Sequence, residues 1–270
     1  MAKGGGRRMH GSWLIDPLYA VSGLAVGILV GLTGVGGGSL MTPLLILVFG
    51  VHPASAVGTD LLYAAATKGV GTIAHHANDS IQWKIVGRLA LGSVPATILT
   101  ILALHHFGAT GPAAAALISI TLGVALVITA VMLFLKGPII RAAIHRNPDF
   151  GLNTAIGYTI VVGFIVGVLV SISSVGAGAL GTSALFFLYP RLTAQKIVGT
   201  DIAHAVPLTL LAGLGHAWLG TVHLHILVSL LAGSIPGIIA GSLATRFTPE
   251  AVLRPALAVI LVVVGVRLLG

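Results

Sequence analysis

Residues 57–60 read Val-Gly-Thr-Asp, and residues 198–201 read Val-Gly-Thr-Asp again. The chain contains only six acidic residues, and two of them, Asp60 and Asp201, end these stretches. Further matches surround the pair at a nearly constant offset: Val35, Gly36, Gly38, Leu40 and Thr42 correspond to Val175, Gly176, Gly178, Leu180 and Thr182, His75 to His216, and 92–95 (Gly-Ser-Val-Pro) to 233–236 (Gly-Ser-Ile-Pro). The sequence therefore predicts an internal duplication.

The composition is too apolar for a water-soluble globule. Of the 270 residues, 56% are hydrophobic and 7% are charged, and the mean hydropathy is +1.08, whereas soluble domains carry roughly 25% charged residues. Ten spans of about 20 residues would use roughly 200 positions and leave only short loops. We therefore expect a multi-pass protein of the cell membrane, for a bacterium the inner membrane, with its function inside the helical bundle.

Apolar segments fall into two matching sets of five. The first set is 14–32, 39–49, 54–77, 85–107 and 112–135, and the second is 152–172, 179–189, 194–219, 224–247 and 251–269. The second segment of each set is too short to span a bilayer, which predicts a short or re-entrant half-helix. The expected organisation is an N-terminal tail at 1–13, a first membrane repeat at 14–136, a basic linker at 137–150 and a second membrane repeat at 151–270.

An odd number of segments in each half inverts the second half in the membrane. The predicted fold class is thus an all-α integral membrane protein, a polytopic helical bundle of two inverted five-segment repeats. The positive-inside rule places the loops that contain Lys84, Arg141 and Arg191 in the cytoplasm and both termini outside. The basic tail, with Arg7 and Arg8, opposes that orientation.

Several classes of function are disfavoured. The excess of 14 Lys and Arg over six acidic residues indicates loop charge rather than nucleic-acid binding in a chain of this composition. The chain has no cysteine, which excludes disulfides and thiolate metal sites. It also lacks an H-E-x-x-H motif, a nucleophile elbow and a Walker A sequence. We expect no enzyme activity, no cofactor and no resident metal.

Two glycine-rich breaks precede the two short segments. Glycines let the backbone break a helix, and the following half-helix then presents N–H groups and a positive dipole end to an anion. The alternative role is close helix packing, which we expect at Gly23, Gly27 and Gly31 from their G-x-x-x-G spacing. The candidate substrate-binding residues are Gly36, Gly37, Gly38, Ser39 and Thr42 in the first half and Ser173, Ser174, Gly176, Gly178 and Thr182 in the second. Both threonines could instead bond to their own helix backbone.

The repeated aspartates are candidate coupling residues because an ionisable side chain at membrane depth is costly and usually functional. Each could carry a proton, bind sodium or orient a neighbouring donor, or could simply cap the N-terminus of a helix. The candidate coupling set is Thr59, Asp60, Thr200, Asp201, His75 and His216, the two histidines being included because the repeat pairs them. Lys68 could attract an anion or extend to an interface, but its counterpart is Thr209.

These residues resemble the TauE/SafE sulfite exporter family, also described as transmembrane sulfite and organosulfonate permeases. The resemblance rests on the G-x-x-G-x-G-G-G stretch at 31–38 that leads to Pro43, and on Val-Gly-Thr-Asp at 57–60, and it covers nearly the whole chain. It implies an α-helical inverted-repeat carrier of small sulfur-containing anions, often outward from the cytoplasm. The second half departs from the full glycine run at Ser173 and Ser174. It therefore stays open whether only one half contacts the anion closely.

The leading hypothesis is a secondary transporter that exports sulfite or short organosulfonates, coupled to protons, by alternating access. Its partners would be the anion and membrane lipid, and we expect no nucleic-acid partner. Whether the protein forms a homo-oligomer stays open. One alternative is a cation or metal transporter that uses Asp60, Asp201 and His204. Another is a membrane enzyme subunit with an unseen cofactor.

Overall fold

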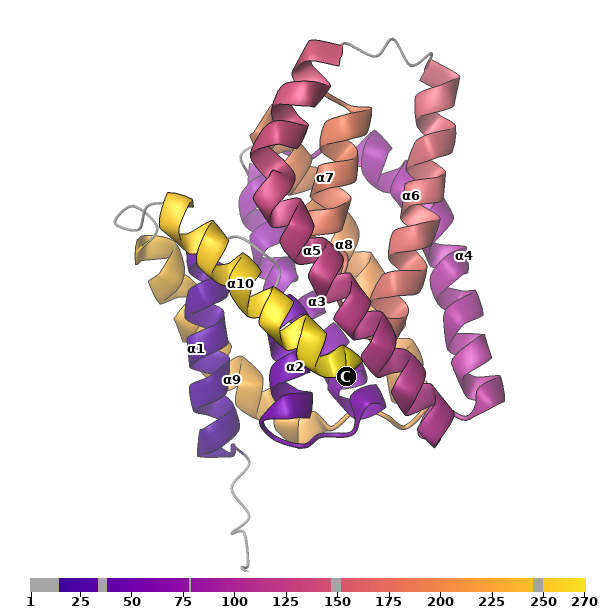
Figure 1. The fold of residues 1–270 in the computed structure, drawn as a ribbon, viewed down its shortest axis with the longest axis vertical. Coiled ribbons are helices and arrows are strands. Elements are labelled where there is room, and N and C mark those ends of the chain that lie inside the picture. Colours follow the sequence, from indigo (N-terminus) through magenta and orange to yellow (C-terminus); the bar gives the residue numbers. More distant parts are fainter. Residues whose placement is uncertain (1–14, 34–37, 78, 147–151, 245–249) are drawn as a thin grey trace, which may run out of the picture.

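The computed structural model describes residues 15–33, 38–77, 79–146, 152–244 and 250–270. Within these ranges every regular element is an α-helix (Figure 1). The helices are α1 (Pro17–Thr33), α2 (Gly38–Leu47), α3 (Pro53–Ala77), α4 (Trp83–Phe107), α5 (Pro112–Arg146), α6 (Leu152–Ser173), α7 (Ala179–Leu188), α8 (Ala194–Trp218), α9 (Leu224–Ala244) and α10 (Glu250–Leu269). The all-α prediction is confirmed.

Five described helices are long and apolar enough to cross a membrane: α4, Pro112–Leu135 of α5, Ala155–Ser173 of α6, α8 and α9. The helices α2 and α7 have ten residues each. At a rise of about 1.5 Å per residue, each covers roughly half of a 30 Å hydrocarbon core. The two short segments predicted from the sequence are therefore present at the expected places.

The helix α5 is longer than predicted. It continues through Pro138 to Arg146, so most of the stretch expected to form a linker at 137–150 is helical. Proline can lie inside a membrane helix because neighbouring groups satisfy the backbone carbonyl that it leaves free. Residues 147–150 lie outside the described ranges.

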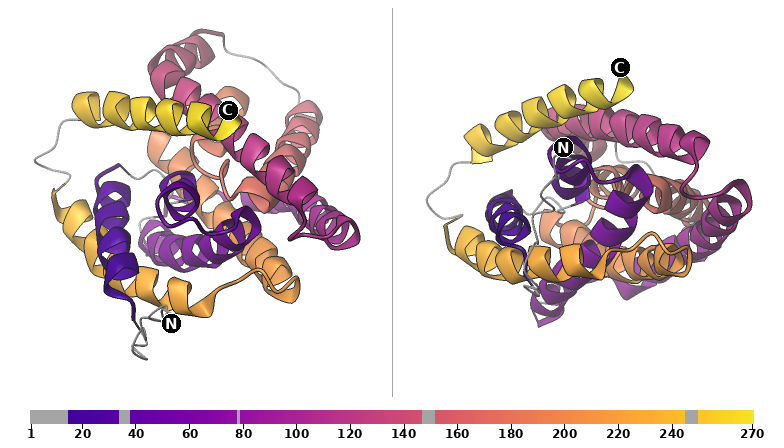
Figure 2. Two further views of the ribbon diagram at one scale, coloured as in Figure 1. Left: turned by 60° about the horizontal axis from the view of Figure 1, so that its bottom comes forward. Right: turned by 90° about the horizontal axis from the view of Figure 1, so that it is seen from below.

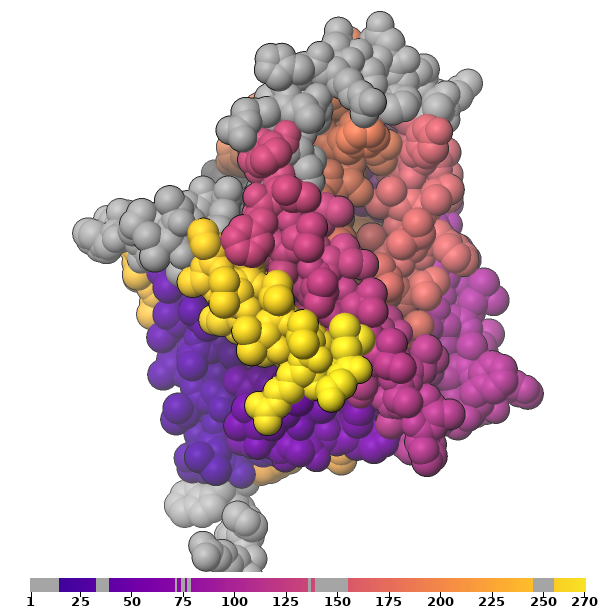
Figure 3. All heavy atoms as spheres, in the orientation of Figure 1, coloured from indigo at the N-terminus to yellow at the C-terminus, as the bar shows by residue number. Residues whose placement is uncertain are grey.

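The two helices that carry the repeated aspartates, α3 and α8, pack against each other in the interior. The pair α1 and α9 lies on one side of them and the pair α4 and α6 on the other, while α10 crosses over α5 on the outside (Figures 1 and 2). The space-filling view shows α10 lying across α5 on that face of the molecule (Figure 3). Each outer pair thus joins a helix from the first half of the chain to one from the second half.

Glycines allow these outer pairs to pack closely, and they recur at equivalent places. A Cβ atom at Gly92 of α4 would overlap the carbonyl oxygen of Ile160 in α6, and one at Gly233 of α9 would overlap that of Ala20 in α1. The four residues form two equivalent pairs, since Gly233 lies 141 positions after Gly92 and Ile160 lies 140 positions after Ala20. The duplication seen in the sequence thus extends to packing contacts.

The G-x-x-x-G packing predicted for α1 is confirmed. Added Cβ atoms at Gly23, Gly27 and Gly31 would all overlap the backbone of α9. Close backbone approach through small residues drives helix association in membranes, where apolar side chains gain little by leaving lipid.

Candidate functional site

Asp60 and Thr42 connect α2 to α3 in the interior of the bundle. The Thr42 hydroxyl donates a hydrogen bond to Oδ2 of Asp60, and both side chains are fully buried. Asp60 is the eighth residue of α3, and Asp201 is the eighth residue of α8. The interpretation of these aspartates as N-caps is therefore wrong, because each helix begins seven residues earlier. The N-cap of α8 is Thr193, whose hydroxyl accepts a hydrogen bond from the Lys196 amide.

The break between α6 and α7 reaches Asp60 from the second half of the chain. Its backbone has positive φ at Ser174 (60°), Gly176 (127°) and Gly178 (139°), a region that glycine adopts most readily. The Ser174 hydroxyl lies beside the Asp60 carboxylate. Neither this hydroxyl nor Oδ1 of Asp60 makes a hydrogen bond with a described residue. A buried polar group without a partner is costly, so these two neighbouring atoms can bond to each other or bind a ligand or a proton.

Lys68 of α3 brings a positive charge to the same place. Its ammonium donates a hydrogen bond of 2.9 Å to the carbonyl oxygen of Ala177, in the α6–α7 break. The Lys68 charge interacts with both Asp60 and Asp201, but the ammonium forms no ion pair with either carboxylate in the described structure. One cation therefore lies near two buried carboxylates without being bound to one of them.

Asp201 contacts α7 in a different way from the contact that Asp60 makes with α2. Its Oδ1 atom lies against Gly181, where an added Cβ would overlap it. The nearby Thr182 hydroxyl donates to the carbonyl oxygens of Gly178 and Ala179 in its own helix, at 2.5 and 3.3 Å. Of the paired threonines, Thr182 therefore bonds to its own helix backbone, one of the two roles left open, whereas Thr42 takes a third role and bonds to a carboxylate.

The threonines that precede the two aspartates hold equivalent hydrogen bonds across the halves. Thr59 Oγ1 accepts from the backbone amide of His223, just before α9, at 3.1 Å. Thr200 Oγ1 accepts from the backbone amide of Gln82, just before α4, at 2.9 Å. Gln82 and His223 are themselves 141 positions apart, so each half binds the other through the same contact.

Replacing Thr200 by valine should destabilise the protein, since it leaves the Gln82 amide without its acceptor. An unsatisfied buried amide costs about 1–3 kcal/mol. We expect a lower melting temperature for the purified Thr200→Val protein in detergent, and a Thr200→Ser variant close to wild type because serine keeps the hydroxyl. Identical melting of the valine and serine variants would show that this bond adds no stability.

The two histidines in the coupling set have different surroundings. His216 is fully buried, with Nε2 bonded to the Ser171 carbonyl oxygen at 2.9 Å and Nδ1 to Thr221 Oγ1 at 3.0 Å. It thereby ties α8 to α6. His75 lies in α3, and its side chain is outside the described part of the structure. A coupling role for either histidine stays a prediction.

The other candidate residues lie around the two breaks. Gly36 and Gly37 fall outside the described residues, Gly38 begins α2 and Ser39 is buried in its first turn. The Ser173 hydroxyl bonds within the α6–α7 break, donating to the Leu169 carbonyl oxygen at 2.7 Å and accepting from the Val175 amide at 3.2 Å. The structure therefore brings Asp60, Thr42 and Ser174 together, whereas Ser173 supports the backbone.

Three residues in or beside α3 and α8 were absent from the candidate substrate-binding and coupling sets: Lys68, His204 and Ser93. His204 Nε2 lies 2.9 Å from Ser93 Oγ, and both residues are buried. Ser93 belongs to the repeated Gly-Ser-x-Pro stretch, which was a usable signal. Lys68 had no such signal because its repeat counterpart is Thr209.

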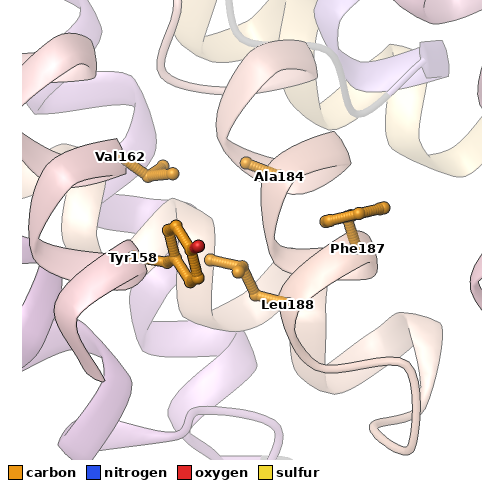
Figure 4. Close-up of a pocket in the computed structure, with 5 residues that line it drawn as sticks. All are labelled: Tyr158, Val162, Ala184, Phe187 and Leu188. Carbon is orange, nitrogen blue, oxygen red and sulfur yellow. The ribbon is translucent and has the colours of Figure 1, made fainter. Parts of the chain in front are cut away.

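Neither a metal cluster nor the pocket between α6 and α7 adds a further binding group to the site around the aspartates in the described part of the chain. Among the described residues, no three His, Asp or Glu side chains come together in a way that could hold a metal ion. A pocket of about 330 Å³ lies between α6 and α7, lined by Tyr158, Val162, Ala184, Phe187 and Leu188 (Figure 4). Its lining carries no charged side chain, so the pocket does not offer an anion a counter-charge.

A bundle of membrane-length apolar helices with charges buried at its centre is the arrangement expected of a membrane transport protein. The family model described as sulfite exporter TauE/SafE matches residues 19–268. The chain is 41% identical to the probable membrane transporter protein YjnA of Bacillus subtilis (strain 168) over 254 residues, 92% of this chain and 97% of that protein. It is 28% identical to the probable membrane transporter protein YdhB of the same organism over 262 residues, 90% and 96% of the two chains. No solved structure matches.

The chain belongs to the TauE/SafE sulfite exporter family. It is a multi-pass membrane transporter, as predicted from the sequence.

Proposed function

We propose that the protein is a secondary transporter that exports a small sulfur-containing anion, such as sulfite or a short organosulfonate, coupled to protons by alternating access. The single observation that carries this proposal is the position of the Lys68 ammonium. It bonds to Ala177 in the α6–α7 break and interacts with both Asp60 and Asp201. A half-buried cation without an ion pair, beside the break between two helices, can bind an anion.

Charge explains why an anion would be coupled to protons at this place. With both aspartates ionised, Asp60, Asp201 and Lys68 carry a net charge of about −1, which repels an anion. At an effective dielectric constant near 20, two unit charges 4 Å apart interact by about 4 kcal/mol. Protonation of one aspartate makes the cluster neutral, and protonation of both makes it positive. The anion and the proton should therefore bind together and move in the same direction.

Outward transport is compatible with this coupling. A divalent anion that moves with one proton carries one net negative charge. Moving one charge across the membrane is worth about 2.3 kcal/mol per 100 mV, and a potential that is negative inside drives a negative charge outward. The direction of net transport then depends on the balance between this potential and the pH gradient.

The proposed architecture is a pair of inverted repeats, at 14–136 and 151–270, each with five helices. An odd number of helices per repeat supports inversion. The equivalent contacts of Thr59 and Thr200, each with the other half, support a pseudo-two-fold relation between the repeats. Rocking of the two halves about the α3–α8 contact would expose the aspartates to one side at a time.

The test is accumulation of labelled sulfite in proteoliposomes of the purified protein, with and without an imposed pH gradient, challenged by sulfate, sulfoacetate and taurine. We expect accumulation driven by the gradient and reduced by at least one competitor. A Lys68→Gln variant should bind the anion at least about tenfold more weakly, the loss of about one charged hydrogen bond. Gly69→Ala is the matched control, because an added Cβ there has nothing within 4 Å.

Absence of uptake of all these anions by folded protein would contradict the proposed substrate class. The same preparation tests the alternatives. Stabilisation by micromolar divalent metal would favour a cation carrier, and an absorption band of a haem or flavin would favour an enzyme subunit.

A further inference from the structure

The side chain one turn after each repeated aspartate differs between the halves. In α8, His204 follows Asp201 by three positions, so both side chains lie on the same side of the helix. His204 is 1% exposed, and its Nε2 lies 2.9 Å from the Ser93 hydroxyl oxygen of α4. The imidazole thus lies one turn after Asp201 on the same side of α8, and it bonds to a hydroxyl on a neighbouring helix.

The same arrangement recurs in the first half with one change. Moving back by 141 positions, Asp201 becomes Asp60 and His204 becomes Tyr63, while Ser93 is equivalent to Ser234 of α9. Tyr63 and Ser234 are fully buried, and their hydroxyl groups lie beside each other. Neither hydroxyl makes a hydrogen bond with a described residue. The two halves thus hold equivalent triads that differ in the central side chain.

The difference matters because histidine and tyrosine handle protons differently. An imidazole has a reference pKa near 6.5, and it can accept a proton at one nitrogen while it releases the proton of the other. A phenol has a reference pKa near 10 and one oxygen through which protons enter and leave. At neutral pH, the imidazole is therefore much better suited to repeated proton transfer.

The surroundings of His204 contain few charged groups. From α3, the charge that acts on His204 is that of Lys68. From α4, the contact is the Ser93 hydroxyl. The only titratable side chain in α6 is that of Tyr158, which is 51% exposed, and α7 has none. A positive charge close by disfavours a second stable cation, so His204 would pass a proton on rather than hold it.

We propose that His204 carries protons to and from Asp201, whereas Tyr63 does not carry protons for Asp60 in the first half. When Asp201 takes up a proton, one ring nitrogen accepts a proton from water on the side to which the site is open, and the other nitrogen releases its own proton to the Asp201 carboxylate. Ser93 positions the ring through Nε2. This assignment rests on the proposed function, because it needs a transporter that is coupled to protons.

The test compares two assays of the same proteoliposomes. Counterflow, the exchange of labelled against unlabelled sulfite at equal pH, needs the substrate site but no net proton movement. Accumulation under a pH gradient needs both the substrate site and net proton movement. For a His204→Tyr variant, which makes the second triad like the first, we expect gradient-driven accumulation to fall by about a hundredfold or more, as when a positioned proton-transfer group is lost. Counterflow should stay within about twofold of wild type.

Two further variants keep the proposal testable if His204→Tyr does not fold. Ser93→Ala keeps the imidazole but removes its partner, and it should shift the pH profile of accumulation without loss of counterflow. Tyr63→Phe is the matched control in the first triad and should leave both assays unchanged. Gradient-driven accumulation that survives in His204→Tyr, or an unchanged pH profile of accumulation in Ser93→Ala, would overturn the proposal. A wild-type protein that exchanges sulfite but ignores the pH gradient would instead overturn proton coupling itself, and with it the role of His204.

Discussion

Replacement of Asp60 by asparagine is expected to abolish the dependence of transport on a proton gradient while anion binding remains measurable. Asparagine keeps a side-chain oxygen that can accept the Thr42 hydrogen bond seen in the structure. It cannot ionise, and so it imitates the protonated aspartate. By the charge argument, the anion should then bind without taking up a proton at this position.

The measurement is gradient-driven accumulation of sulfite beside equilibrium binding over a range of pH. Wild-type binding should weaken as the pH rises, because the ionised carboxylates repel the anion. Binding to Asp60→Asn should change less with pH. Asp201→Asn provides the comparison in the second half, at the same position of its helix. Unchanged coupling in Asp60→Asn would remove Asp60 from the mechanism.

The second large effect is expected on folding, from Gly92→Ala. The new methyl group would overlap the Ile160 carbonyl oxygen and lie within 2.7 Å of the Phe164 amide nitrogen. These are backbone atoms, so α4 and α6 must separate along their length to make room. Overpacking costs typically about 1–3 kcal/mol and occasionally more, and we expect a value of about 3 kcal/mol because no side chain can move aside.

Gly87→Ala is the matched control for Gly92→Ala, five positions earlier in the same helix. An added Cβ at Gly87 has no atom within 4 Å, and alanine is the better helix former. We expect the melting temperature of Gly92→Ala to fall by roughly 6–12 °C at about 2–4 °C per kcal/mol, and that of Gly87→Ala to hold or rise. Equal melting of both variants would mean that the close contact of α4 with α6 is not needed for stability.

The positions of the helices could largely be predicted from the sequence. Each expected segment, including the short ones at 39–49 and 179–189, corresponds to a helix with ends within a few residues. The reason is that a bilayer demands apolar segments of a set length with internally satisfied backbone. The exception was the 137–150 stretch, where charge and proline suggested a linker but the helix continues to Arg146.

The contacts within the candidate site were harder to predict from the sequence than the positions of the helices. Asp60 and Thr42 were selected separately, and their hydrogen bond appears only in the fold. The N-cap alternative failed because the start of a membrane helix is not marked by a clear change in polarity, and Asp60 lies inside a helix that begins at Pro53. Lys68 was set aside because repeat symmetry did not support it, yet it bonds to the break in the second half.

By itself, the sequence determined that this is a membrane protein, where its helices lie and which residues of the two halves correspond. Only the tertiary structure decided which side chains meet, such as His204 with Ser93 and Lys68 with Ala177. The physical reason is that lipid and protein interior are both apolar. Hydropathy therefore cannot distinguish the inward face of a helix from its lipid-facing side. In α4, Leu99 and Leu102 are more than half exposed while Thr97 is fully buried, the reverse of the pattern that water imposes on a soluble protein.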